Sequence, residues 1–177
     1  MNAQQTVWVS ALALTFLAAW TDWRTRLIPN WLTISGIILG IALHFGTGGW
    51  RGVASSVEGM LLALGLLLPL VVMRALGAGD WKLMGAAGAL LGPGMLIFVL
   101  LASIFVSGMM AAARMVTAGR IRDTIRNIVA LIRGFALLGL HPNPEISLDN
   151  PQLMKLPFGV AAAAGTLICF LIARWGR

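Results

Sequence analysis

Charged residues are scarce in this sequence. Only 11% of its 177 residues are Asp, Glu, Lys or Arg and 59% are hydrophobic, whereas an ordinary soluble domain has roughly a quarter charged residues. The composition predicts an integral-membrane protein, and the length suits one domain covering residues 1–177. The net charge of +7 does not indicate nucleic-acid binding, because the basic residues stand in short runs between apolar segments, as in cytoplasmic membrane loops.

Cysteine and histidine are nearly absent as well. The single cysteine, Cys169, excludes a disulfide within the chain and a zinc site built from cysteines. Its position in an apolar run indicates a small packing residue. The two histidines, His44 and His141, are remote from the acidic pair discussed below. We therefore expect no metal and no other cofactor.

Six apolar segments make up most of the chain. A membrane span needs about 20 apolar residues, or fewer where the bilayer thins or the ends are interfacial. The fourth segment is short, and only Gly92-Pro93-Gly94 separates it from the fifth. We predict an all-α, polytopic membrane protein with about six transmembrane helices, the first being retained rather than removed as a signal peptide. The segments cover residues 7–20, 31–45, 53–73, 81–92, 95–113 and 158–173.

The distribution of basic residues predicts the orientation. With six spans and the N-terminus outside, ten of the thirteen Lys and Arg residues fall on the cytoplasmic side, and the inverted arrangement would leave only three there. The positive-inside rule favours the first arrangement. The ten are Arg24, Arg26, Arg74, Lys82, Arg114, Arg120, Arg122, Arg126, Arg133 and Lys155.

One long polar connection, about residues 117–155, joins the last two segments. Positions 121, 125, 128, 129 and 132 are apolar at helical spacing, with basic residues on much of the remaining surface. This pattern predicts an amphipathic helix lying in the cytoplasmic interface against anionic lipid head groups. The alternative is a helical extension of the fifth span. Prolines in the second half indicate a loop.

Two of the six acids, Asp22 and Asp80, need an explanation. Three others lie in the polar connection, and Glu58 lies near the outer face of its span. Asp22 stands at the inner end of the first span and Asp80 at the inner start of the fourth. The topology therefore places both carboxylates in the same leaflet, where they are free to meet. Ionisable groups at membrane depth are candidates for function.

Each aspartate also has a purely structural explanation. Asp80 could cap the helix that follows it, and Asp22 could form a local ion pair with Arg24 or Arg26. Neither explanation accounts for the glycines of Gly77-Ala78-Gly79. Glycine allows unusual backbone angles and the close approach of another chain.

Two neighbouring carboxylates suit peptide hydrolysis. They cannot both ionise easily, so one keeps a proton while the other is charged. The ionised one takes a proton from water as that water attacks the peptide carbonyl, and the protonated one donates to the carbonyl oxygen. No serine stands in a nucleophile-elbow pattern that would offer another route.

Three stretches resemble the type IV prepilin peptidases, membrane aspartic proteases of the Gly-x-Gly-Asp class. The likeness spans residues 11–171, and the order and spacing of the stretches also agree. They are Asp22-Trp23-Arg24-Thr25-Arg26-Leu27-Ile28-Pro29-Asn30, Gly77-Ala78-Gly79-Asp80-Trp81-Lys82-Leu83 and Lys155-Leu156-Pro157-Phe158-Gly159-Val160-Ala161.

The resemblance implies a function and a set of site residues. Members of this family cut the short basic leader from prepilins at the cytoplasmic face of the bacterial inner membrane, so the implied partners are a prepilin substrate and membrane lipids. Asp22 and Asp80 would be catalytic. The implied substrate-binding residues are Gly77, Gly79, Pro157, Phe158 and Gly159.

The chain departs from the larger, bifunctional family members. It has no cysteine pair of the kind carried by their N-terminal domain, and Val160 stands where they tend to have proline. It resembles the short form found in tight-adherence, or Flp-type, pilus systems, which argues against N-methyltransferase activity.

Two other functions fit the same carboxylates. A small proton-coupled transporter would relay protons through acids in the membrane, but the second, fifth and sixth segments contain no Asp or Glu. A catalytically inactive scaffold of a secretion apparatus is the third hypothesis, and the presence of both aspartates argues against it.

Overall fold

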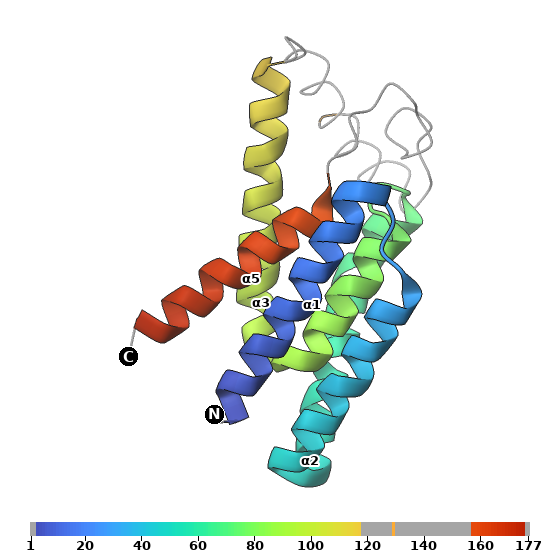
Figure 1. Ribbon diagram of the computed structural model, residues 1–177. Helices are drawn as coiled ribbons and strands as arrows, with labels where there is room; N and C mark the ends of the chain where they lie inside the picture. The colour runs from blue at the N-terminus through green and yellow to red at the C-terminus, as the bar shows by residue number, and fades with distance from the viewer. Residues whose placement is uncertain (1–2, 118–128, 130–156, 176–177) are drawn as a thin grey trace.

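A computed structural model describes residues 3–117, 129 and 157–175 of the chain. Its secondary structure is helical, in the order α1 (Ala3–Thr25), α2 (Asn30–Val72), α3 (Ala78–Thr117) and α5 (Phe158–Trp175) (Figure 1). Three of these helices, α2, α3 and α5, are long and apolar enough to cross a membrane. The all-α prediction is thus confirmed for the described chain. The predicted interfacial helix and the loop after it lie outside these residues.

Both long helices contain one non-helical residue. In α2 this is Gly49 (φ 56°, ψ −139°) and in α3 it is Gly92 (φ 71°, ψ 172°). Positive φ is readily adopted only by glycine, which explains the residue type at both breaks. Past Gly49 the chain turns back, since a Cβ on Gly52 would overlap the carbonyl of His44, and Figure 1 shows the reversal at the lower end of α2. Gly49 falls between two of the apolar segments predicted from the sequence, and Gly92 is the last residue of the predicted segment 81–92.

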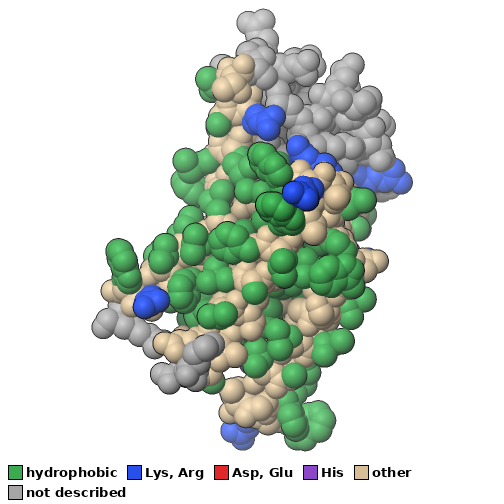
Figure 2. Space-filling view, in the orientation of Figure 1, with side chains coloured by type: hydrophobic (Ala, Val, Ile, Leu, Met, Phe, Trp, Pro, Cys, Tyr) green, Lys and Arg blue, Asp and Glu red, His purple; other side chains and the backbone are tan. Residues whose placement is uncertain are grey.

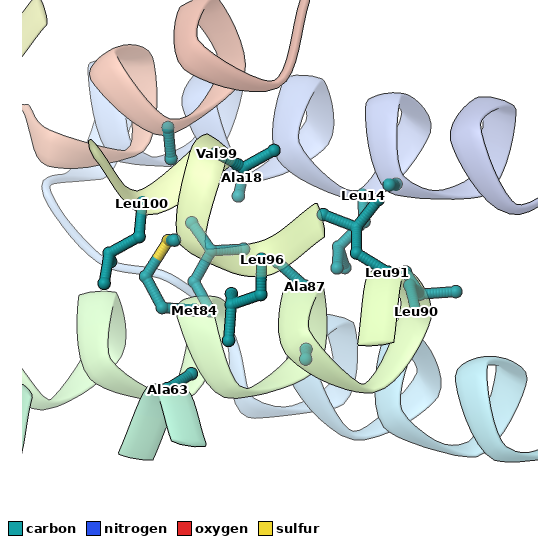
Figure 3. Close-up of a cluster of buried hydrophobic side chains, with 14 of the residues drawn as sticks. Leu14, Ala18, Ala63, Met84, Ala87, Leu90, Leu91, Leu96, Val99 and Leu100 are labelled. Atoms are coloured by element: carbon teal, nitrogen blue, oxygen red, sulfur yellow. The ribbon is translucent and has the colours of Figure 1, made fainter. Parts of the chain in front are cut away.

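The first part of α3 forms the centre of the bundle. Every residue from Leu83 to Gly92 is buried, as expected for a helix that is surrounded on all sides. Figure 3 shows side chains from α1, α2 and both parts of α3 meeting around it. They include Leu14, Ala18, Ala63, Met84, Leu90, Leu96 and Val99.

Glycines bring α2 close to both sides of this central segment. A Cβ on Gly40 would lie 2.6 Å from the carbonyl carbon of Ala89, and a Cβ on Gly59 would overlap the carbonyl oxygen of Gly88. Small residues permit such close approach of helix backbones. These glycines therefore allow α2 and α3 to pack closely within the chain.

Polar side chains from α2 stabilise the break in α3. Pro93 has no N–H, so the carbonyl of Ala89 loses its usual helical partner. The hydroxyl of Ser56 donates to this oxygen over 2.7 Å. His44 Nε2 lies 2.9 Å from the carbonyl oxygen of Leu90, which can only accept, so Nε2 carries the hydrogen. The backbone groups that the break frees are thus satisfied inside the bundle.

The surface has the character expected in a bilayer. Hydrophobic side chains cover most of the face seen in Figure 2, and most of the visible Lys and Arg side chains gather at its upper end. Exposed tryptophans mark two levels: Trp31 is the second residue of α2, and Trp50 directly follows the break at Gly49. They are 19 positions apart, which corresponds to about 28 Å of helix. This matches the thickness of a hydrocarbon core bordered by aromatic belts.

Candidate active site

The end of α1, the connection between α2 and α3 and the start of α5 lie together at one end of the bundle (Figure 1). Asp22 belongs to the last turn of α1, Asp80 to the first turn of α3 and Gly159 to the first turn of α5. We call this region the aspartate end. It contains residues from all three motifs found in the sequence.

Asp22 is held by the start of α5. Its side chain is only 7% exposed, and its Oδ2 accepts a hydrogen bond of 2.9 Å from the backbone N–H of Gly159. A Cβ on Gly159 would lie 3.0 Å from the Cβ of Asp22. Glycine is therefore the residue that allows α5 to approach the carboxylate so closely.

The side-chain carboxylate of Asp80 lies close to the backbone of Gly77. A Cβ on Gly77 would lie 3.0 Å from Oδ2 of Asp80, so a side chain at this position would displace the carboxylate. Neither Gly77 nor Gly79 has a positive φ. Of the two reasons proposed for these glycines, close approach therefore applies and unusual backbone angles do not.

The first two motifs pack directly against each other. A Cβ on Gly79 would lie 3.3 Å from the Cβ of Ile28, so glycine makes room for the chain that follows α1. Nearby, Lys82 Nζ donates to Asn30 Oδ1 over 3.1 Å, joining the first turns of α3 and α2. Two segments some fifty positions apart in the sequence are thus fixed side by side.

The two carboxylates lie within electrostatic range of each other. Arg26 directly follows α1 and has a left-handed backbone conformation (φ 56°). Its backbone N–H donates to the carbonyl oxygen of Asp22, and its charge acts on the Asp22 carboxylate. Arg24 lies instead over the ring of Trp20, 4.4 Å from its centroid. Of the two predicted local partners of Asp22, only Arg26 acts on it.

The remaining predicted residues lie at the start of α5. Pro157 is buried, and its carbonyl accepts the N–H of Val160 over 3.2 Å. Phe158 is half-buried and packs against the core. The structure thus places Gly159 in contact with Asp22 and Gly77 in contact with Asp80, whereas Gly79 packs against Ile28.

Sequence reasoning missed one residue of the site, Trp81. Its indole Nε1 donates to the carbonyl of Leu64 in α2 over 2.8 Å. This hydrogen bond attaches the helix turn that carries Asp80 to α2. An aromatic residue with a polar handle directly after the aspartate was the available signal. Among residues 3–117 and 157–175, no three His, Cys, Asp or Glu side chains group as a metal site would require.

Comparison with known proteins identifies the family. The model of the type IV leader peptidase family matches residues 9–112, a range that contains both aspartates and more than half of the chain. Comparisons with curated proteins and with solved structures found no match. On the strength of the family match, the chain belongs to the type IV leader peptidase family.

Proposed function

We propose that the protein is a prepilin leader peptidase that uses Asp22 and Asp80 as an aspartic catalytic pair. The observation that carries the proposal is the convergence of these two carboxylates, from helices far apart in the sequence, at one end of an apolar bundle. Family membership supports the reaction class. The substrate class follows from the resemblance to the prepilin peptidases.

The pair hydrolyses a peptide bond without a covalent intermediate. The ionised carboxylate removes a proton from a water molecule whose oxygen attacks the carbonyl carbon, and the protonated carboxyl group donates its proton to the carbonyl oxygen. When the resulting diol collapses, the first carboxyl group passes its proton to the amine nitrogen as the C–N bond breaks. The second recovers a proton from the diol hydroxyl, and the starting state returns.

The aspartate end faces the cytoplasm in this proposal. The breaks at Gly49 and Gly92 divide α2 and α3 into two segments each, which with α1 and α5 supports six spans of the bacterial inner membrane. Most of the basic residues would then lie at the aspartate end, in agreement with the positive-inside rule. A prepilin would present its basic leader there and leave its hydrophobic segment in the bilayer.

Three of the five residues assigned to substrate binding contact the chain itself. Gly77 leaves room for Asp80, Gly79 for Ile28, and Gly159 for Asp22. These contacts favour roles in shaping the catalytic pair. The extended substrate would then bind the exposed surface beside the catalytic pair.

The proposal is tested with purified protein and a peptide that joins a short basic leader to a hydrophobic pilin-like segment. Leader release is followed by mass spectrometry. Asp22→Asn and Asp80→Asn should each lower the rate by about 10³-fold or more, because each removes a proton-transfer group. Glu58→Gln, the same chemical change at an exposed position of α2, should retain activity. Normal cleavage by either Asp variant would refute the catalytic pair.

A further inference from the structure

We infer that Gly159 is a positioning residue whose backbone amide and lack of a side chain hold Asp22 as the charged member of the catalytic pair. The inference rests on the proposed peptidase function and deepens it. It assigns Asp22 as the base that activates water and Asp80 as the acid that protonates the carbonyl oxygen.

The first support is the donor at Asp22. The N–H of Gly159 points at Oδ2 over 2.9 Å in a buried setting. It belongs to the first turn of α5, where backbone N–H groups have no helical partner and carry partial positive charge. A donor of this kind favours the ionised form of a carboxylate.

The second support is the lack of space around Gly159. A Cβ there would lie 3.0 Å from Asp22 Cβ, 3.1 Å from its Oδ2 and 3.2 Å from the carbonyl oxygen of Ala18. The φ of Gly159 is not positive, so glycine is needed for proximity alone. Any side chain would push α5 away from α1 or turn the carboxylate away from its donor.

The third support is the contrast with Asp80. Different charged groups act on the two carboxylates: the guanidinium of Arg26 acts on Asp22, whereas the Asp22 carboxylate itself acts on Asp80. The proton of the pair therefore resides on Asp80, which is then ready to donate it.

The test is the Gly159→Ala variant, with kcat and KM measured across pH. A carboxylate moved by a few tenths of an ångström should lower kcat about tenfold, since a 1 Å misplacement can cost about a hundredfold. KM should stay unchanged. The acid limb of the kcat profile should move to higher pH, because the charged form of Asp22 loses part of its stabilisation.

Gly36→Ala is the matched control. Its Cβ would meet Leu14 side-chain atoms at 2.9 Å and Ala86 at 3.3 Å, a similar crowding two helical turns from Asp22. It should lower thermal stability and leave the pH profile unchanged. If Gly159→Ala does not fold, Pro157→Ala replaces it: loosening the turn before α5 should shift the same limb in the same direction.

The outcomes separate the inference from the proposed function. A folded Gly159→Ala variant with wild-type kcat and pH profile would overturn the positioning role, while the losses in Asp22→Asn and Asp80→Asn still upheld the catalytic pair. An equal change in both glycine variants would also overturn it, because the effect would then be general crowding. Wild-type protein that cuts no prepilin peptide would remove the proposed function and this inference with it.

Discussion

The two ends of the helix bundle both place polar groups in apolar surroundings, but they use them differently. Around the break in α3, which we call the Gly92 end, Ser56 and His44 donate to the carbonyls of Ala89 and Leu90. At the aspartate end, the Asp22 carboxylate accepts the backbone N–H of Gly159, which occupies one of its about four acceptor positions.

The polar groups at the Gly92 end have a structural role, whereas those at the aspartate end are suited to a chemical one. Polar groups whose hydrogen bonds are all made inside a low-dielectric bundle rigidify it, as at the Gly92 end. Carboxylates with unused acceptors remain available to bind water and a substrate. Substitutions at the Gly92 end should therefore change stability without changing the turnover of folded protein, and those at the aspartate end should do the reverse.

Gly88→Ala should have the largest effect on stability. Its Cβ would overlap the carbonyl oxygen of Gly59 and lie 2.7 Å from the carbonyl carbon. Because both neighbours are backbone atoms, helix α2 must move, and we expect a loss of about 3 kcal/mol. Thermal unfolding in detergent, followed by circular dichroism, measures it. An unchanged melting temperature would contradict the tight packing between α2 and α3.

Gly77→Ala tests the aspartate end by the same chemical change. The new Cβ would lie 3.0 Å from Asp80 Oδ2, and the displaced carboxylate should lower kcat by about ten- to a hundredfold. Stability should change little, because the atom that must move is the end of a side chain. The two variants together compare the two ends of the bundle. If Gly77→Ala lost as much stability as Gly88→Ala and kept a normal kcat, the proposed difference between the ends would be wrong.

Ser56→Ala should have a smaller effect on stability. It leaves the Ala89 carbonyl without the donor now at 2.7 Å, and an unpaired buried acceptor costs about 1–3 kcal/mol. The melting temperature should fall, while kcat per folded molecule stays at the wild-type value. Ser35→Ala is a suitable control, since that hydroxyl donates only within its own helix, to Leu32.

Much of this arrangement could be predicted from the sequence. Long apolar runs located the helical segments, and Gly92-Pro93 indicated the break, because these residues cannot continue a regular helix. Counting spans placed Asp22 and Asp80 at the same end. Each of these features depends on local residue patterns, which a single sequence displays directly.

Contacts made by backbone atoms could not be predicted in this way. The amide of Gly159 reaches Asp22 across 137 positions, and every residue except proline has such an amide, so no side-chain pattern marks it. The same applies to the Ala89 carbonyl that Ser56 satisfies. For the same reason Gly77, Gly79 and Gly159 were assigned to substrate contact. The side chains that lie against them, those of Asp80, Ile28 and Asp22, become known only when the helices are packed together.

Trp81→Phe should have the smallest effect and tests how firmly the aspartate end is supported. Phenylalanine keeps an aromatic ring of similar shape but loses the indole N–H that donates to Leu64 over 2.8 Å. A typical hydrogen bond contributes about 1 kcal/mol, so we expect a melting temperature lower by a few degrees and kcat lower by about threefold, as the first turn of α3 loosens under Asp80. Because Trp81 lies next to the aspartate and binds α2, both readouts should move together, unlike in Gly77→Ala or Ser56→Ala. A variant that lost stability with unchanged kcat would show that the turn carrying Asp80 is fixed by Gly77 and Gly79 alone.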